Sequence, residues 1–265
     1  MIESMNTYRI VLIAALLSMT SILMGQPAQA LPTAQEIAQK IYDRDDGKTA
    51  ESEMTMSLIP DEGSARERTM KVFSKDFGEK SKRLILFSAP KKIQGTSFLS
   101  LEQHDKDDLQ FLYLPALRRV RRIAGSQKAR SFVNSDFTYE DMERRKVERD
   151  SYTLLGSEMI DGRDTWKLER KARDEDDSQY AKSILWVVKD SYVVVKSELY
   201  DKKGKLSKHY TAKKLEKVDG IWTALEMSMQ DVQRGHTTIN KIVSVKYNRP
   251  VSDDIFTKAY MERSG

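Results

Sequence analysis

The sequence predicts a mainly β protein of the α+β class, in which an antiparallel meander of strands is flanked by a helix at each end. Two observations favour this class: short segments with alternating apolar and polar residues, and turn dipeptides between them such as Asp161-Gly162 and Asp219-Gly220. A third is that helical spacing with cap residues occurs only near the two ends, so βαβ units are not indicated.

Residues 1–30 have the features of a signal peptide. Arg9 provides a basic start, Ile10–Leu17 is an apolar run, and Ala28-Gln29-Ala30 offers small residues to a leader peptidase. The alternative, a membrane anchor, is disfavoured because the apolar run is short and interrupted by serines. We therefore expect cleavage after Ala30, a periplasmic location, and one domain over residues 31–265.

The sequence contains no cysteine, which excludes disulfides, a lipid-anchored mature form and cysteine-based metal sites. Its formal net charge of +5 fits anionic head groups or an acidic partner, and export argues against a nucleic-acid partner. No Gly-x-Ser-x-Gly elbow, glycine-rich phosphate loop or histidine pair with ligand spacing is present. We expect no enzymatic activity, no metal and no cofactor, and the acidic run Asp174–Asp177 is expected to be a solvated turn.

The opening helix is predicted over residues 33–46. Thr33 and Glu36 have the spacing of a capping box, Ile37 begins a narrow apolar stripe, and Gly47 is a suitable stop. Because the stripe is narrow, we expect this helix to lie at the edge of a larger apolar surface.

Strands are predicted along most of the remaining chain. They cover Met54–Leu58, Thr69–Phe73, Arg83–Phe87, Thr96–Leu101, Leu109–Leu114, Thr165–Arg170, Ser183–Val188, Val193–Leu199, Leu206–Lys214, Thr223–Met229 and Thr237–Tyr247. The alternation fails between Pro115 and Arg149, and Ser252 caps a closing helix predicted over Asp253–Met261.

The central stretch begins with an unusual concentration of arginine: Arg118, Arg119, Arg121 and Arg122. On a strand these side chains occupy both faces, and neither face can then be buried, so the segment must be an edge, a rim or a protrusion. Three interpretations remain open. The arginines contact phosphate head groups or a partner protein, they pair with nearby acids (Asp136, Glu140, Asp141 and Glu143), or they protect a sheet edge from aggregation.

Three aromatic residues, Phe132, Phe137 and Tyr139, follow in an otherwise polar loop. Either they attach the loop to the body of the protein, or the loop is a mobile flap over a pocket.

Methionines at alternating strand positions suit a surface that accepts varied apolar ligands, although each of them also suits ordinary core packing. We expect the lipid-binding residues to be Met54, Met56, Leu58, Leu84, Leu86, Phe98, Phe111, Met227 and Met229.

Three segments are distinctive as motifs: Pro90–Leu99, Leu112–Ile123 and Ser135–Asp141. They resemble the LolA-like family of outer membrane lipoprotein-sorting proteins, in the branch associated with RND/MMPL-type exporters, and the opening helix and Asp254-Ile-Phe-Thr257 also fit. The resemblance covers essentially all of residues 31–265. It implies a strongly curved, incomplete antiparallel β-barrel, closed by helices over an apolar concavity.

The resemblance also implies a carrier or acceptor of a lipid or acyl chain that works with an inner-membrane RND-type exporter and contacts membranes peripherally. Such a carrier needs no catalytic residues. The alternative from the same fold is a sensor or adaptor that binds a protein partner through the arginine-rich segment.

Overall fold

The computed structural model describes residues 31–104 and 106–265, so the predicted signal peptide and its cleavage site lie outside the described residues. In this part of the chain a single 13-stranded antiparallel sheet is flanked by two short helices. The elements are α1 (Ala34–Tyr42), β1 (Thr49–Ile59), β2 (Arg66–Phe77), β3 (Lys80–Ala89), β4 (Ser97–Leu101), β5 (Leu109–Leu114), β6 (Arg119–Ile123), β7 (Asp150–Ile160), β8 (Arg163–Ala172), β9 (Lys182–Val188), β10 (Val194–Tyr200), β11 (Leu206–Val218), β12 (Ile221–Asp231), β13 (His236–Tyr247) and α2 (Lys258–Arg263).

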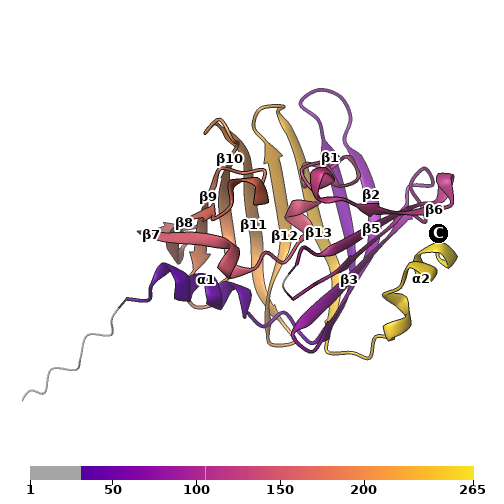
Figure 1. Ribbon diagram of the computed structural model, residues 1–265, viewed down its shortest axis with the longest axis horizontal. Coiled ribbons are helices and arrows are strands. Elements are labelled where there is room, and N and C mark those ends of the chain that lie inside the picture. Colours follow the sequence, from indigo (N-terminus) through magenta and orange to yellow (C-terminus); the bar gives the residue numbers. More distant parts are fainter. Residues whose placement is uncertain (1–30, 105) are drawn as a thin grey trace, which may run out of the picture. The chain divides into compact units, whose positions relative to one another are not determined.

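The order of strands explains how the two halves of the sheet meet. The order is β6-β5-β4-β3-β2-β1-β13-β12-β11-β10-β9-β8-β7, so β1 pairs with β13 at the centre and β6 and β7 form the two edges. The sheet is curved and is not closed into a barrel (Figure 1). Residues 124–149 connect one edge to the other, and their aromatics Phe132, Phe137 and Tyr139 pack on the concave side of the sheet.

Apolar residues cover both faces of the sheet. On the inner, concave face, one cluster includes Met56, Phe98 and Met229 together with the aromatics of the crossing segment. On the outer face, a second cluster beneath α2 contains Leu84, Phe111 and Met261, whose side chains are almost completely excluded from water. In β4 and β9, strand neighbours that point in opposite directions are therefore both buried, whereas most of the edge strand β7 is exposed.

Helix α1 begins as the sequence predicts but ends earlier. Thr33 accepts a hydrogen bond from the backbone of Glu36, and the Glu36 carboxylate accepts from the backbone of Thr33, which completes the capping box. The helix ends at Tyr42 instead of continuing to residue 46, and Asp43 is its C-cap. Gly47, at φ +81°, instead turns the chain into β1.

Ile37 and Ala38 of α1 are buried, and the helix packs against β7 at the edge of the sheet (Figure 1). The predicted position at the edge of a larger apolar surface is therefore correct.

Two further predictions need correction. The closing helix is not continuous over Asp253–Met261: a one-turn 3₁₀ helix, Asp253–Ile255, is followed by α2 with its own cap, Thr257. The central stretch is also not devoid of strand, because Arg119–Ile123 forms the edge strand β6. None of the helices in the described part of the chain has the length and hydropathy of a membrane span.

Candidate ligand-binding cavity

Strand register shows which predicted lipid-binding residues share the concave face. Strand β13 lies between β1, which carries Met54, Met56 and Leu58, and β12, which carries Met227 and Met229. Phe98 of β4 points to the same face of the sheet as these residues. Met56, Leu58, Phe98 and Met229 are buried together in the inner cluster, against which Met54 packs. Met227 is half-buried beside them.

Leu84, Leu86 and Phe111 do not line the concavity. Leu84 pairs with Leu99, which pairs with Phe111, and this row faces outward because the adjacent Ile85 faces inward. Leu84 and Phe111 are core residues beneath α2, and Leu86 packs against that cluster. Alternating strands with both faces apolar do not show from the sequence which face is the inner one.

The crossing segment, residues 124–149, fills one part of the concave face with its own aromatic side chains. Phe132, Phe137 and Tyr139 are all buried, and the rings of Phe98, Phe132 and Tyr139 stack edge-on or tilted at centroid distances of 5.1–5.9 Å. In this structure the aromatics therefore attach the loop to the sheet, as one of the two sequence interpretations expects. A role as a flap remains a prediction.

Polar contacts hold the crossing segment from both sides. Arg68 of β2 donates to the carbonyl of Val133, and Gln110 of β5 donates to the carbonyl of Tyr139 at 2.8 Å. From the other half of the sheet, Lys208 donates to the carbonyl of Asp136 at 2.6 Å. The crossing segment therefore bridges the two halves of the sheet as well as connecting its edges.

The Asp136 carboxylate is buried and accepts further hydrogen bonds from β13. Thr238 donates to it at 2.6 Å, and His236 lies 3.0 Å away on the same face of the strand. His236 is consequently half-buried on the concave face.

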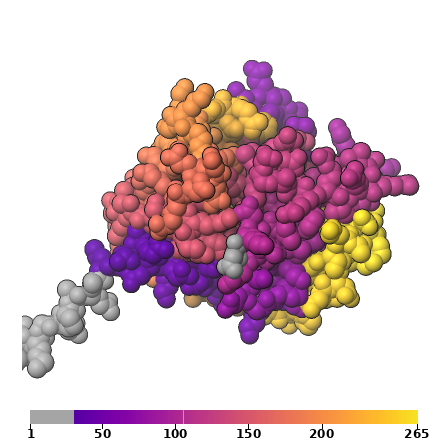
Figure 2. Space-filling view, viewed as in Figure 1, coloured from indigo at the N-terminus to yellow at the C-terminus, as the bar shows by residue number. Residues whose placement is uncertain are grey.

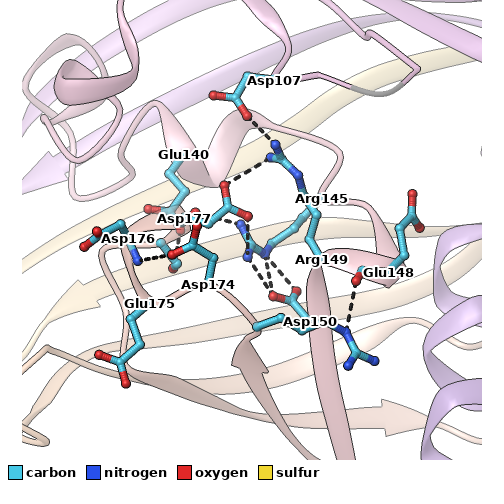
Figure 3. A network of polar contacts seen from close by, with 12 residues as sticks. Asp107, Glu140, Arg145, Glu148, Arg149, Asp150, Asp174, Glu175, Asp176 and Asp177 are labelled. Atoms are coloured by element: carbon cyan, nitrogen blue, oxygen red, sulfur yellow. Dashed lines mark hydrogen bonds and ion pairs between the residues drawn. The ribbon is translucent and has the colours of Figure 1, made fainter.

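The end of the crossing segment is held by an ion-pair network (Figure 3). Arg145 forms a bidentate contact with the fully buried Asp150 of β7, at 2.7–2.9 Å, and also reaches Asp177 at 3.2 Å. Arg149 pairs with Asp107 and Asp177. Asp177 therefore belongs to a structural network, so the acidic run is more than the solvated turn predicted.

A second group of charges closes the segment against α1 and β4. Lys146 contacts the buried Glu102 at 3.0 Å, and Tyr42 donates to the same carboxylate at 2.7 Å. Burial alone would raise the pKa of Glu102, but the hydrogen bonds from Tyr42, Lys146 and Ser81 hold it below its ordinary value. Glu102 therefore remains a carboxylate that accepts several donors.

A cavity of about 450 Å³ remains between α1, the crossing segment and the inner face of the sheet. Its apolar side is formed by Ala38 and Ile41 of α1, Phe137 and Met142 of the crossing segment, and a group from β9–β12: Leu185, Val194, Leu199, Tyr210 and Met229. In Figure 2 the magenta to pink residues, which include the crossing segment, lie in the middle of the face turned to the viewer, between orange and yellow residues from later in the chain.

The other side of the cavity is polar. It includes Arg44, Asp46, Arg83, Ser100 and Asp108. Of the residues predicted to bind lipid, Met229 alone lines the cavity in the described part of the chain, together with Phe137 of the predicted flap. The polar side was not predicted, because Arg83 occurs at the start of an ordinary alternating strand and nothing in its neighbours marks it.

The four predicted contact arginines lie at the free edge of the sheet. Arg119 and Arg121 share the inner face with Ile123, whereas Arg122 is on the outer face opposite Phe111. Arg118 and all three strand arginines are exposed. The acids expected as their partners contact other residues: Glu143, for example, pairs with Lys128 at 2.7 Å, and Asp141 with Lys208 at 3.6 Å.

Similar proteins agree with this architecture. A family model described as an uncharacterized protein, DUF1329-like, matches residues 79–263. A DUF1329 family protein from Desulfovibrio piger is 32% identical, with a TM-score of 0.82 over 86% of this chain and 97% of that chain. The chain belongs to the DUF1329 family.

Other structures connect the DUF1329 family with LolA-like proteins. A domain from Vibrio parahaemolyticus described as an outer membrane lipoprotein-sorting protein is 32% identical, with a TM-score of 0.81 over 87% of this chain and 98% of that chain. A LolA superfamily protein from Nitrosomonas europaea is 21% identical and shares the fold, with a TM-score of 0.68 over 87% of this chain and 100% of that one. The LolA-like resemblance predicted from the sequence is confirmed. Among proteins with curated functions, none matches the chain.

Proposed function

We propose that this DUF1329 protein is a non-enzymatic carrier or acceptor that binds a lipid or acyl chain in the cavity on the concave face of the sheet. The observation that carries this proposal is the apolar wall that β9–β12, α1 and the crossing segment form together. A volume of about 450 Å³ lies within the range of small-molecule sites in proteins.

The free energy of transferring apolar groups out of water favours binding at such a site. Each methylene group of an acyl chain that stays in water costs about 0.8 kcal/mol relative to a buried one, so a chain of many methylenes does not cross an aqueous compartment unaided. An apolar wall removes this cost without covalent chemistry. The lipoprotein-sorting description of the Vibrio parahaemolyticus domain supports the same type of cargo.

Phe137 of the crossing segment lines the cavity, and Phe132 and Tyr139 occupy the concave face beside it. We propose that this segment is the flap predicted from the sequence: an entering acyl chain displaces it, and it returns when the chain leaves.

We further propose that the protein acts in the periplasm after removal of residues 1–30, in peripheral contact with membranes, and that an inner-membrane RND-type exporter is its partner. Its support is the signal-peptide pattern and the branch that the sequence motifs resemble.

The test is binding of a neutral apolar dye, N-phenylnaphthylamine, to delipidated protein. Val194 lines the cavity, and the indole of Val194→Trp would occupy ligand space, so we expect affinity to fall by at least about tenfold. Val243→Trp is the matched control, because Val243 is 65% exposed. Absence of dye binding to the unmodified protein, or equal loss in both variants at unchanged melting temperature, would contradict the proposal.

A second candidate function is supported by the exposed arginines on edge strand β6. These four cations (Arg118, Arg119, Arg121 and Arg122) form no ion pair with any described residue, and they fit an adaptor that binds an acidic partner protein.

Replacing the four arginines with glutamate should abolish capture of the co-expressed exporter and leave dye binding unchanged. Four exposed lysines elsewhere on the sheet (Lys71, Lys213, Lys214 and Lys241), replaced in the same way, control for total charge. Unchanged capture by the arginine variant would eliminate this second function.

A further inference from the structure

Arg83 lies where the inner face of the sheet changes from apolar to polar. Ile85 of β3 pairs with Phe98 of β4, and both are buried and apolar. Two residues earlier on the same face of β3, Arg83 lies between Ser74 of β2 and Ser100 of β4. Arg83 and Ser100 both line the cavity. The apolar part of the concave face therefore ends at Ile85, and Arg83 is the next residue of β3 on that face.

The guanidinium of Arg83 has no hydrogen-bond or ion-pair partner among residues 31–104 and 106–265. Its side chain has exposed surface towards the cavity. Burial by the surrounding protein lowers the pKa of Arg83, and the charges of Asp46, Asp108 and Glu102 oppose this effect. An arginine keeps its charge in such a place, so the cavity contains a cation without a direct partner.

Two more arginines increase the positive charge of the cavity. Arg44 donates to the carbonyl of Trp222 at 3.1 Å, and Arg144 donates to the carbonyl of Tyr42 at 2.6 Å. Neither has a carboxylate within 4.0 Å in the described part of the chain. Carbonyl oxygens fix these side chains without neutralising them.

Most carboxylates that line the cavity are engaged by other groups. Glu102 accepts from Lys146 and Tyr42, Glu140 accepts from the backbone of Gln179, and Asp141 accepts from Thr138. Three arginines (Arg44, Arg83 and Arg144) and three acids (Asp46, Asp108 and Glu140) of the lining have no ion pair in the described part of the chain, and burial raises the pKa of Asp108. Arg83 differs from the other two arginines because no carbonyl oxygen fixes its guanidinium, which leaves all its donors available to a ligand.

We propose that Arg83 binds the anionic head group, a carboxylate or a phosphate, of a single-chain amphiphile whose hydrocarbon chain lies against the apolar wall. This inference rests on the proposed carrier function and names its ligand class. The planar guanidinium suits bidentate contact with either anion, and the hydroxyl of Tyr210, which lines the cavity, offers a further donor. Tyr210 remains protonated as a donor, since burial raises its pKa to about 12.

The experiment compares palmitate, hexadecyl phosphate and the uncharged methyl palmitate as competitors of the bound dye. Because the neutral ester lacks the charge, we expect the unmodified protein to prefer either anion over the ester by at least about tenfold. In Arg83→Met this preference should fall to within about threefold, while affinity for the ester stays unchanged. Arg83→Lys should retain an intermediate preference, since a lysine keeps the charge without the planar fork.

The matched control is Arg66→Met, in which an exposed arginine at the start of β2, outside the cavity lining, is lost and the preference should be unchanged. Equal affinity of the unmodified protein for the anions and the ester, or a preserved preference in Arg83→Met, would overturn the assignment of Arg83 and leave the carrier function intact. Failure of all three amphiphiles to compete would instead overturn the carrier function. Competition by acetate or inorganic phosphate at the concentration effective for the amphiphiles would identify a site for free anions and overturn the head-group assignment.

Discussion

At the scale of single residues, Glu143 of the crossing segment has a carboxyl group whose pKa is strongly raised. Its side chain is 8% exposed and contacts Lys128 at 2.7 Å, and Lys128 also contacts Asp107 at 2.8 Å. Burial raises the pKa of Glu143 to about 7, and the hydrogen bond and charge of Lys128 oppose this rise only in part. Glu143 therefore titrates near neutral pH in the folded protein.

Stability should depend on pH through this residue. A carboxyl whose folded pKa is raised stabilises the fold fully below its ordinary pKa of 4.5, and this stabilisation is lost as pH rises through about 7. Glu143→Gln removes the titration, so its stability relative to the unmodified protein should increase by about 1–3 kcal/mol between pH 5 and pH 8. Urea denaturation of both proteins at the two pH values measures this difference. A difference that does not change with pH would show that Glu143 is not the titrating group.

At the scale of elements, the crossing segment is held by contacts of two kinds. Its aromatics pack into the inner cluster, whereas its end is attached to β7 by the Arg145–Asp150 pair (Figure 3). Asp150 is fully buried and accepts three hydrogen bonds from Arg145. Removing one partner of such a pair leaves an uncompensated charge in a place with little water.

Asp150→Ala should therefore lower the free energy of unfolding by about 3–5 kcal/mol. The exposed pair Lys71–Glu53, with side chains 50% and 52% exposed, provides the control, and Lys71→Ala should cost less than about 1 kcal/mol. Chemical denaturation gives both values. Similar small losses in the two variants would mean that the network in Figure 3 contributes little to holding the segment.

The same element shows where sequence reasoning was limited. The arginine pattern correctly predicts an edge, because β6 is the edge strand and its guanidinium groups are exposed. It did not predict the partners of the acids that follow. Glu140, for instance, accepts from the backbone of Gln179, a residue 39 positions away, and such a contact depends on the path of the whole chain.

At the scale of the whole molecule, the pairing of β1 with β13 determines the position of the cavity. It joins two meanders at their first and last strands, so β6 and β7 become opposite edges, and the chain between them crosses the concave side, where its aromatics pack in the inner cluster. Each local pairing is a hairpin between sequence neighbours, which explains why the strands themselves were predictable from alternation and turns. The pairing of β1 with β13 connects residues nearly 200 positions apart and has no local signal.

The sequence by itself determined the mainly β class, the capping box of α1, most of the strands and the edge position of the arginines, because these depend on periodicity and on residues close together in the chain. The LolA-like resemblance was also recognisable from motifs. Only the tertiary structure decided that Leu84, Leu86 and Phe111 face away from the concavity and that Arg83 faces into the cavity. The physical reason is that a strand with apolar residues on both faces has no sequence mark for its inner side, and curvature and register alone make one face the wall of a cavity.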